Sequence, residues 1–239
     1  MNTSLRIWIT GASTGIGAAT AVALAKAGHR VFLTARNLAQ LEKTCAAYPD
    51  LMEFAACDVT QADQVQACWE QQMKRWGGLD ALIPNAGIGY FDPLKQAKLT
   101  EWQAMVDVNI TGVLNTIHAA LPALVASKGH VINIGSIAAR QVFPNSGVYC
   151  ATKHAVLAIS ESLRTEFRED LAVTTINPGA VNTPFIDRTT NDSLRSDYRP
   201  QFDEGMSPEY VAEAILFALE SRGKGVVSEL TIRPDIRKI

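Results

Sequence analysis

The chain has 239 residues, enough for one large α/β domain, and its 47% hydrophobic and 19% charged content is typical of a globular enzyme. Its formal net charge of -2 argues against nucleic acid or an anionic membrane as a partner. The 4 cysteines are scattered, without a CxxC pair or a histidine at metal-ligand spacing, so we expect reduced thiols and no metal site. The opening residues lack the apolar run of a signal peptide, and no apolar stretch of membrane-spanning length is expected; both features favour a cytoplasmic protein.

Strand-like and helix-like segments alternate along the chain. In chain order the first half predicts a strand at Leu5–Thr10, a helix at 15–28, a strand at Arg30–Ala35, a helix at Leu38–Ala47, a strand at Met52–Ala56, a helix at Gln61–Trp76 and a strand at Ala81–Pro84. The second half predicts a helix at Thr100–Ser127, a strand at His130–Ile134, a helix at Tyr149–Glu169, a strand at Ala172–Asn177, a polar loop at Pro184–Gly205, a helix at Pro208–Ser221 and a strand at Val226–Ile232.

Several of these strands, such as HVINI and VTTIN, are almost entirely apolar. Continuous apolar strands separated by helices indicate a parallel sheet that is covered on both faces. We therefore expect an α/β fold, a doubly wound, Rossmann-like parallel sheet of about seven strands. With no repeat and no linker, residues 1–239 are expected to form a single domain, in which a loop at about 184–205 contacts the substrate.

A glycine-rich turn, TGASTGIG, follows the first strand and leads directly into a helix. Its glycines, Gly11, Gly15 and Gly17, allow the backbone to approach a pyrophosphate, and the amides at the helix N-terminus point at its charge. Glycine clusters also occur in ordinary turns, but the order of strand, turn and helix favours a dinucleotide site. The GxxxGxG spacing differs from the commonest GxGxxG pattern.

The second strand ends at Ala35, where NAD-binding sheets usually place an acidic residue for the ribose 2′-hydroxyl. An alanine leaves room for a 2′-phosphate, and the next residue, Arg36, can hold that phosphate through paired hydrogen bonds. The alternative is a solvated arginine at a helix start. After the third strand, Asp58 can bind an adenine amino group, with a plain helix-capping role for its neighbour Thr60 as the alternative.

Tyr149 and Lys153 lie four residues apart, hence on one face of a helix. An ammonium about 4 Å from the phenol favours the tyrosinate by about 4 kcal/mol, which predicts a Tyr149 pKa lowered from about 10 towards about 7. Such a tyrosine is an effective general acid and base. Ser136 comes directly after the HVINIGS strand, and Asn109 stands within the long helix, where asparagine is a poor helix former.

Together these motifs, in this order, resemble the short-chain dehydrogenase/reductase family over nearly the whole chain. Asn109, Ser136, Tyr149 and Lys153 are similar to its catalytic tetrad. The resemblance implies proton transfer by Tyr149, stabilisation of the substrate oxygen by Ser136, binding of the nicotinamide ribose by Lys153 and a relay water on Asn109. It also implies a cofactor site made of Gly11, Ser13, Thr14, Gly15, Ile16, Gly17, Arg36, Asp58, Val59, Asn85, Ala86, Gly87, Tyr149, Lys153, Pro178, Gly179, Val181 and Thr183.

Two features depart from or narrow the family pattern. Pro84 replaces the first asparagine of NNAG, so a side-chain amide and a backbone donor are lost there. The ending SELTIRPDIRKI lacks the glycine-rich finish common in oxoacyl-carrier-protein reductases and looks more like the branch that acts on short 3-hydroxy acids and related alcohols.

The expected function is thus NADP-dependent hydride transfer between nicotinamide and a carbonyl or secondary alcohol, with NAD the less favoured cofactor and a dimer or tetramer as the implied assembly. A non-catalytic dinucleotide sensor and a lyase or epimerase on the same fold are the alternatives. In the 184–205 segment, Arg188, Arg195 and Arg199 are balanced by aspartates. The segment is therefore either a solvated lid, or one arginine binds a substrate carboxylate.

Overall fold

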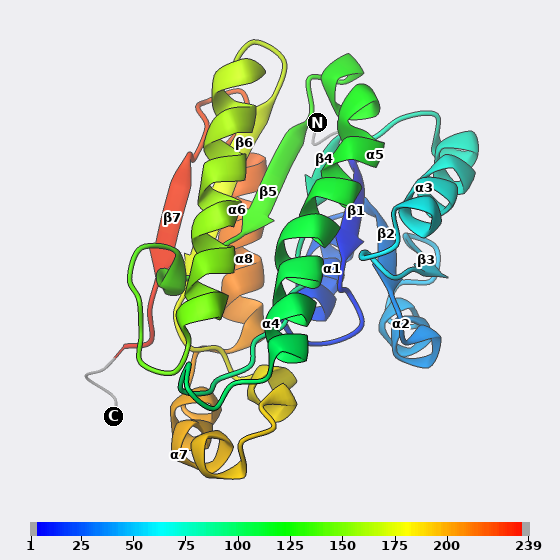
Figure 1. Ribbon diagram of the computed structural model, residues 1–239. Helices are drawn as coiled ribbons and strands as arrows, with labels where there is room; N and C mark the ends of the chain where they lie inside the picture. Colours follow the sequence, from blue (N-terminus) through cyan, green and yellow to red (C-terminus); the bar gives the residue numbers. More distant parts are fainter. Residues whose placement is uncertain (1–3, 236–239) are drawn as a thin grey trace.

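The computed structural model describes residues 4–235, and within them seven parallel strands form one sheet in the order β3-β2-β1-β4-β5-β6-β7 (Figure 1). The expected doubly wound, Rossmann-like architecture is confirmed. The strands are β1 (Arg6–Thr10), β2 (Arg30–Ala35), β3 (Met52–Ala56), β4 (Ala81–Ile83), β5 (His130–Ile134), β6 (Ala172–Pro178) and β7 (Glu229–Ile232). The order reverses between β1 and β4, the kind of crevice where open α/β sheets bind ligands.

The helices lie on both faces of the sheet. They are α1 (Gly15–Lys26), α2 (Leu38–Cys45), α3 (Ala62–Trp76), α4 (Leu99–Val106), α5 (Gly112–Ala126), α6 (Gly147–Glu166), α7 (Asp192–Asp203) and α8 (Pro208–Glu220). Buried residues of α1, α2 and α8 share one core with the sheet, while those of α3, α5 and α6 form a second core. The assignment of residues 1–239 to a single domain stays a prediction, because the chain ends lie outside the described residues.

The strand β1 shows how one sequence serves both cores. Its side chains alternate between the faces of the sheet, so Ile7 and Ile9 join the core under α1 and α8. Trp8, which is fully buried, enters the opposite core and stacks on Trp69 of α3, with ring centroids 5.2 Å apart. A continuous apolar strand is therefore required, as the sequence predicts.

The long helix expected at Thr100–Ser127 is observed as α4 and α5, joined by a π-helical turn, η1 (Asp107–Thr111). Leu99–Ala126 is long and apolar enough to cross a membrane by length and composition, since an 18-residue window in it has a mean hydropathy of 1.4, contrary to the expectation that no such stretch exists. Its buried residues, Val113, Ile117, Ala120 and Leu124, pack in the core beneath α5. These contacts are those of a core helix.

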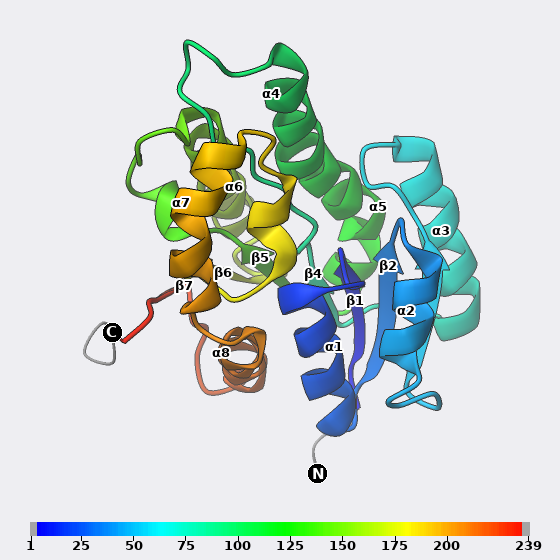
Figure 2. The ribbon, with the colours of Figure 1, turned by 90° about the horizontal axis from the view of Figure 1, so that it is seen from below.

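Two other expectations about the second half of the chain are wrong. The segment expected to be a polar loop at Pro184–Gly205 contains a 3-10 helix, η3 (Pro184–Arg188), and α7. Asn191 caps α7, since its side-chain oxygen accepts from the amide of Leu194, whereas no residue of α7 is buried. The last strand begins at Glu229 rather than Val226. Figures 1 and 2 show α7 beyond the carboxyl ends of the strands, over the ligand-binding edge.

Candidate active site

A cavity of about 760 Å³ opens at the carboxyl edge of the sheet and runs from the glycine-rich turn to a group of aromatic rings. Its volume is within the range of ligand and cofactor sites. Nearly all of the predicted site residues line it. The exceptions are Gly17 and Asn109, which are absent from the wall.

The glycine-rich turn forms a tight cradle that side chains would fill. Gly11 and Gly15 have φ of +65° and +57°, the left-handed region that favours glycine. A Cβ on Gly11 would lie 2.7 Å from the Cα of Ala86, and one on Gly17 would lie 2.5 Å from the carbonyl oxygen of Gly11. Side chains at Gly11 and Gly17 would therefore collide with the protein itself, and the turn presents bare backbone to the cavity at Gly11 and Gly15, as close approach by a dinucleotide pyrophosphate requires.

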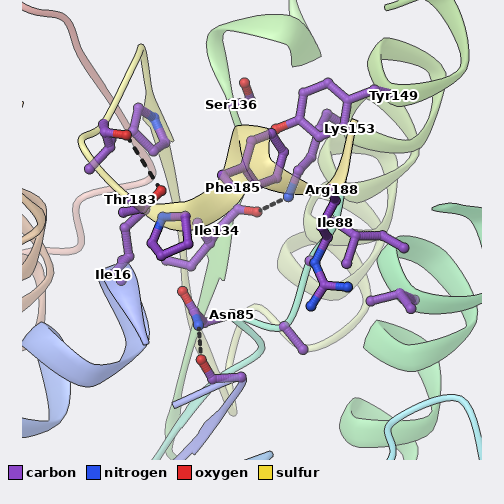
Figure 3. Close-up of a pocket in the computed structure, with 18 of the residues that line it drawn as sticks. Ile16, Asn85, Ile88, Ile134, Ser136, Tyr149, Lys153, Thr183, Phe185 and Arg188 are labelled. Atoms are coloured by element: carbon purple, nitrogen blue, oxygen red, sulfur yellow. Dashed lines mark hydrogen bonds between the residues drawn. The ribbon is translucent and has the colours of Figure 1, made fainter. Parts of the chain in front are cut away.

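The turn after β4 is held to the glycine cradle by hydrogen bonds from Asn85. Its side-chain amide, which Figure 3 shows bonded to a carbonyl oxygen, donates to Thr10 and Gly11. Its backbone amide donates to the Thr10 hydroxyl, as does the backbone amide of Ala86. Pro84 is buried at the end of the strand. The turn is thus held to the cradle without a side-chain amide at position 84.

At the nucleotide end, Ala35 and Arg36 both line the cavity, with Ala35 buried and Arg36 exposed. The next residue, Asn37, caps α2 by accepting a hydrogen bond from Gln40. Asp58 is also in the wall, and its carboxylate accepts bonds from the backbone amide and the hydroxyl of Thr60. One oxygen of Asp58 therefore serves the turn before α3. The helix-capping role considered for Thr60 is wrong, because the N-cap of α3 is Gln61 and no side chain caps that helix.

Ser136, Tyr149 and Lys153 meet in the middle of the cavity (Figure 3). Ser136 ends up there because it caps η2 (Ile137–Ala139), with its hydroxyl accepting from the amide of Ala138. Tyr149 and Lys153 come from the first turns of α6. The Lys153 ammonium nitrogen donates to the carbonyl oxygen of Ile134 at 2.9 Å and lies 5.9 Å from the centroid of the Tyr149 ring.

The expected lowering of the Tyr149 pKa by Lys153 is contradicted. Burial raises the pKa of Tyr149 to about 12, and the hydroxyl of Ser136 opposes that rise. Burial also lowers the pKa of Lys153 to about 8. Spacing along a helix places the two side chains on one face, but the ammonium is directed to Ile134 and not to the phenol oxygen.

Asn109 lies in the centre of the π-helical turn and is 1% exposed. Its side-chain oxygen accepts from the amide of Ile88, and its nitrogen donates to the carbonyl oxygen of Ile88 and to the Thr152 hydroxyl. The widened turn lets an asparagine side chain fix the segment after β4 against α6. Anchoring of a relay water by Asn109 stays a prediction.

A series of hydrogen bonds behind Ser136 could not be predicted from the sequence. The fully buried Asn177 accepts from the backbone amide of Ser136 and donates to Glu229 at 2.7 Å, and Glu229 forms an ion pair with Arg140. Gly135 makes room for it, since a Cβ there would lie 2.1 Å from the Asn177 oxygen. The only signal in the sequence is the position of Asn177 before the PG pair.

The far end of the cavity is aromatic. Phe91 lies edge-on to Tyr149, Phe185 and Tyr198, with ring centroids 6.0, 6.2 and 5.6 Å away. Phe143 and Phe202 complete this wall. Its residues come from the segment after β4, from the loop before α6 and from η3 and α7. The segment 184–205 therefore lines the cavity, and its contact with a substrate stays a prediction.

Known proteins match both the sequence and the fold. The sequence model of the short chain dehydrogenase family matches residues 6–193. An uncharacterised oxidoreductase of Staphylococcus saprophyticus is 39% identical over 97% of this chain and 96% of its own length, and one of Listeria monocytogenes is 38% identical over 95% of each.

Two solved structures are similar over almost the whole chain. The alcohol dehydrogenase from the archaeon Thermococcus sibiricus, complexed with 5-hydroxy-NADP, has a TM-score of 0.87 at 30% identity, covering 98% of this chain and 97% of that one. The closed form of a serine dehydrogenase complexed with NADP+ has a TM-score of 0.90 at 28% identity, covering 96% and 95%.

Proposed function

This chain belongs to the short-chain dehydrogenase family, and on that premise we propose that it catalyses NADP-dependent hydride transfer between nicotinamide and a carbonyl compound or secondary alcohol. One observation carries the proposal: Ser136, Tyr149 and Lys153 share a single cavity with the glycine cradle. The cradle binds the dinucleotide, and the three side chains surround the place where the substrate oxygen must lie.

Each side chain has a separate task. A bound nicotinamide supplies the hydride in reduction and accepts it in oxidation. Tyr149 donates a proton to the carbonyl oxygen as the carbonyl carbon gains the hydride, and it takes that proton back in alcohol oxidation. Ser136 donates a hydrogen bond to the same oxygen and stabilises its developing negative charge. Lys153, held by Ile134, orients the nicotinamide ribose.

The preference for NADP is supported by the end of β2. No acidic residue stands at Ala35 or in the two positions after it, and the Arg36 guanidinium is exposed at the cavity wall. A 2′-phosphate gains an ion pair there, whereas the ribose of NAD finds no carboxylate to accept its hydroxyl.

The cofactor proposal is tested by kcat/KM with NADPH and with NADH. The wild type is expected to favour NADPH, and Ala35→Asp is expected to reverse the order because its carboxylate repels the phosphate. Arg30→Gln, at the opposite end of the same strand, serves as the control that changes neither value. A wild type that favours NADH would overturn the preference for NADP.

For the substrate, we propose a short 3-hydroxy acid or a related small alcohol. The structurally similar serine dehydrogenase supports this class, since serine is itself a 3-hydroxy acid. Net oxidation of NADPH by a panel of ketones and aldehydes, followed by absorbance, separates a reductase from a dinucleotide sensor and from a lyase or epimerase. Neither alternative consumes NADPH in proportion to the substrate, so the absence of net oxidation across the panel would favour them.

We also propose that the enzyme is a homo-oligomer, dimer or tetramer. The long helix Leu99–Ala126 exposes Val106 and Leu114 to 40% and 47%, and such side chains gain from burial against a second copy. Light scattering of the purified protein tests this, and a monomer at micromolar concentration would contradict it.

A further inference from the structure

The segment 184–205 carries three arginines with different partners. Arg195 donates to the Asp192 carboxylate and to the carbonyl oxygen of Thr189, and Arg199 forms an ion pair with Asp187. Arg188 lines the cavity, and among residues 4–235 its side chain forms neither an ion pair nor a hydrogen bond. Two of the three charges therefore stabilise the segment, and the third has no partner within the described part of the chain.

The local helix aims Arg188 at the cavity. Arg188 follows Phe185 by three residues in the 3-10 helix η3, where side chains at i and i+3 lie above one another. Phe185 packs against the Tyr149 ring at 5.5 Å, so its face of η3 is the one directed at the catalytic tyrosine. Figure 3 shows the Arg188 guanidinium reaching into the cavity, with Lys153 and Ile88 drawn around it.

The charges of the cavity wall are unequal. Among the described residues, the one acidic side chain in it, Asp58, belongs to the nucleotide end and is bonded to Thr60. In the same part of the chain, residues 4–235, the wall near Tyr149 contains two cations, Lys153 and Arg188, and no carboxylate. A cationic substrate is disfavoured there, whereas an anionic group gains an ion pair without first breaking one inside the protein.

We propose that Arg188 binds the carboxylate of the substrate, so that the enzyme acts on hydroxy acids and oxo acids with an apolar body. This inference rests on the proposed function and assigns a substrate class to the same site. A guanidinium matches the two oxygens of a carboxylate and fixes the acid in one orientation relative to Tyr149. The rings of Phe91, Phe143 and Phe202 take the apolar remainder.

The experiment compares acids with their methyl esters in NADP-linked oxidation. The pairs are 3-hydroxybutanoate and 3-hydroxy-3-phenylpropanoate, each against its ester, with 1-phenylethanol as a neutral reference. The variants are Arg188→Gln and Arg188→Lys, with Arg195→Gln as the matched control because Arg195 is paired within the segment and does not line the cavity. The Kd of NADP is measured for every variant.

In the wild type, kcat/KM for at least one acid is expected to exceed that for its ester by about 10- to 100-fold, the range of a charge-assisted contact. Arg188→Gln removes this ratio and leaves the ester, the neutral alcohol and the Kd of NADP within about twofold. Arg188→Lys keeps part of the ratio, because an ammonium retains the charge but not the paired geometry. Arg195→Gln keeps all of it.

Equal kcat/KM for acid and ester in both pairs would overturn the proposal. So would an Arg188→Gln variant that binds NADP more weakly but keeps the acid-to-ester ratio, because Arg188 would then bind a cofactor phosphate. Turnover of the neutral alcohol shows separately that the proposed function holds. If no compound is oxidised, calorimetry with 3-phenylpropanoate and its amide, in the presence of NADP, decides the matter. Tighter binding of the acid that Arg188→Gln abolishes supports the proposal, and equal binding overturns it.

Discussion

The two ends of the cavity are built on different principles. The nucleotide end is centred on the glycine-rich turn, and β1 and α1 hold it on both sides of the turn. The substrate end is made of aromatic side chains and of the cations Lys153 and Arg188. It is carried partly by η3 and α7, and α7 has no buried residue. The first end is therefore anchored in the core of the domain, whereas part of the second rests on a helix that the core does not hold.

Tyr149→Phe tests the point where the two ends meet and should have the largest effect. Loss of the proton donor is expected to lower kcat by about 10²- to 10⁴-fold while the Kd of NADPH stays near the wild-type value. Tyr198→Phe is the control, because its ring also lines the cavity but its hydroxyl bonds to Asn145 and Pro144. More than a tenth of the activity left in Tyr149→Phe would contradict the assignment.

Gly17→Ala tests the rigid end. Its methyl group would lie 2.5 Å from the Gly11 carbonyl oxygen and from the Asn85 amide, and neither can move without opening the turn. The free energy of unfolding should fall by about 1–3 kcal/mol, as for overpacked cores, and NADPH binding should weaken. Gly225→Ala, with no atom within 4 Å of the added carbon, should change neither quantity. Unaltered binding by Gly17→Ala would contradict the cradle.

Asn177→Ala tests the chain of hydrogen bonds behind Ser136. Without an acceptor for the Ser136 amide, the catalytic hydroxyl loses its position, and we expect kcat to fall by about tenfold with little change in the Kd of NADPH. Asn133→Ala is the matched control, since Asn133 is equally buried but bonds to Ser160, outside the cavity wall. Equal losses of kcat in both variants would mean that Asn177 stabilises the fold and does not specifically position Ser136.

A pair of helix caps compares the ends directly. Asn37 caps α2 at the nucleotide end, and Asn191 caps α7 at the substrate end. Replacing each cap by alanine should destabilise its helix by about 1 kcal/mol. Asn37→Ala is expected to raise the KM of NADPH alone, and Asn191→Ala that of the substrate alone. If Asn37→Ala raised the KM of the substrate and Asn191→Ala raised that of NADPH, the assignment of the nucleotide end and the substrate end would be wrong.

The smallest expected effect concerns pH. Because burial raises the pKa of Tyr149 to about 12, the phenol stays protonated and able to donate through neutral pH. The kcat/KM for reduction should therefore be level from pH 6 to about 8, where Lys153, with its pKa lowered to about 8, begins to lose its charge. A decline of kcat/KM with a midpoint near pH 7 would instead support the lowered Tyr149 pKa that the sequence predicts.

The sequence predicted the features that depend on local pattern and missed those that depend on contacts between distant residues. Apolar runs placed the strands, and the residues singled out by the glycine turn and by the Tyr149–Lys153 spacing line one cavity. The residues that escaped prediction act through space: Asn177 reaches Glu229 across 52 positions, and the Tyr149 pKa depends on burial that spacing does not describe. The helix α7 escaped because its sequence is polar, with Pro200 inside it and none of its residues buried.

The π-helical turn at Asp107–Thr111 also shows where the chain can change its length. Such a turn holds one residue more than a turn of α-helix, so deleting one residue inside it would leave a regular helix in which α5 keeps its face towards the sheet, while the bond from Asn109 to Ile88 is lost. A deletion within α5 would instead rotate everything after it by about 100°, because each residue of a regular α-helix turns the chain by that angle, and Ile117 and Leu124 would leave the core. In a library of single-residue deletions, losses of stability are therefore expected to be larger within α5 than at the turn.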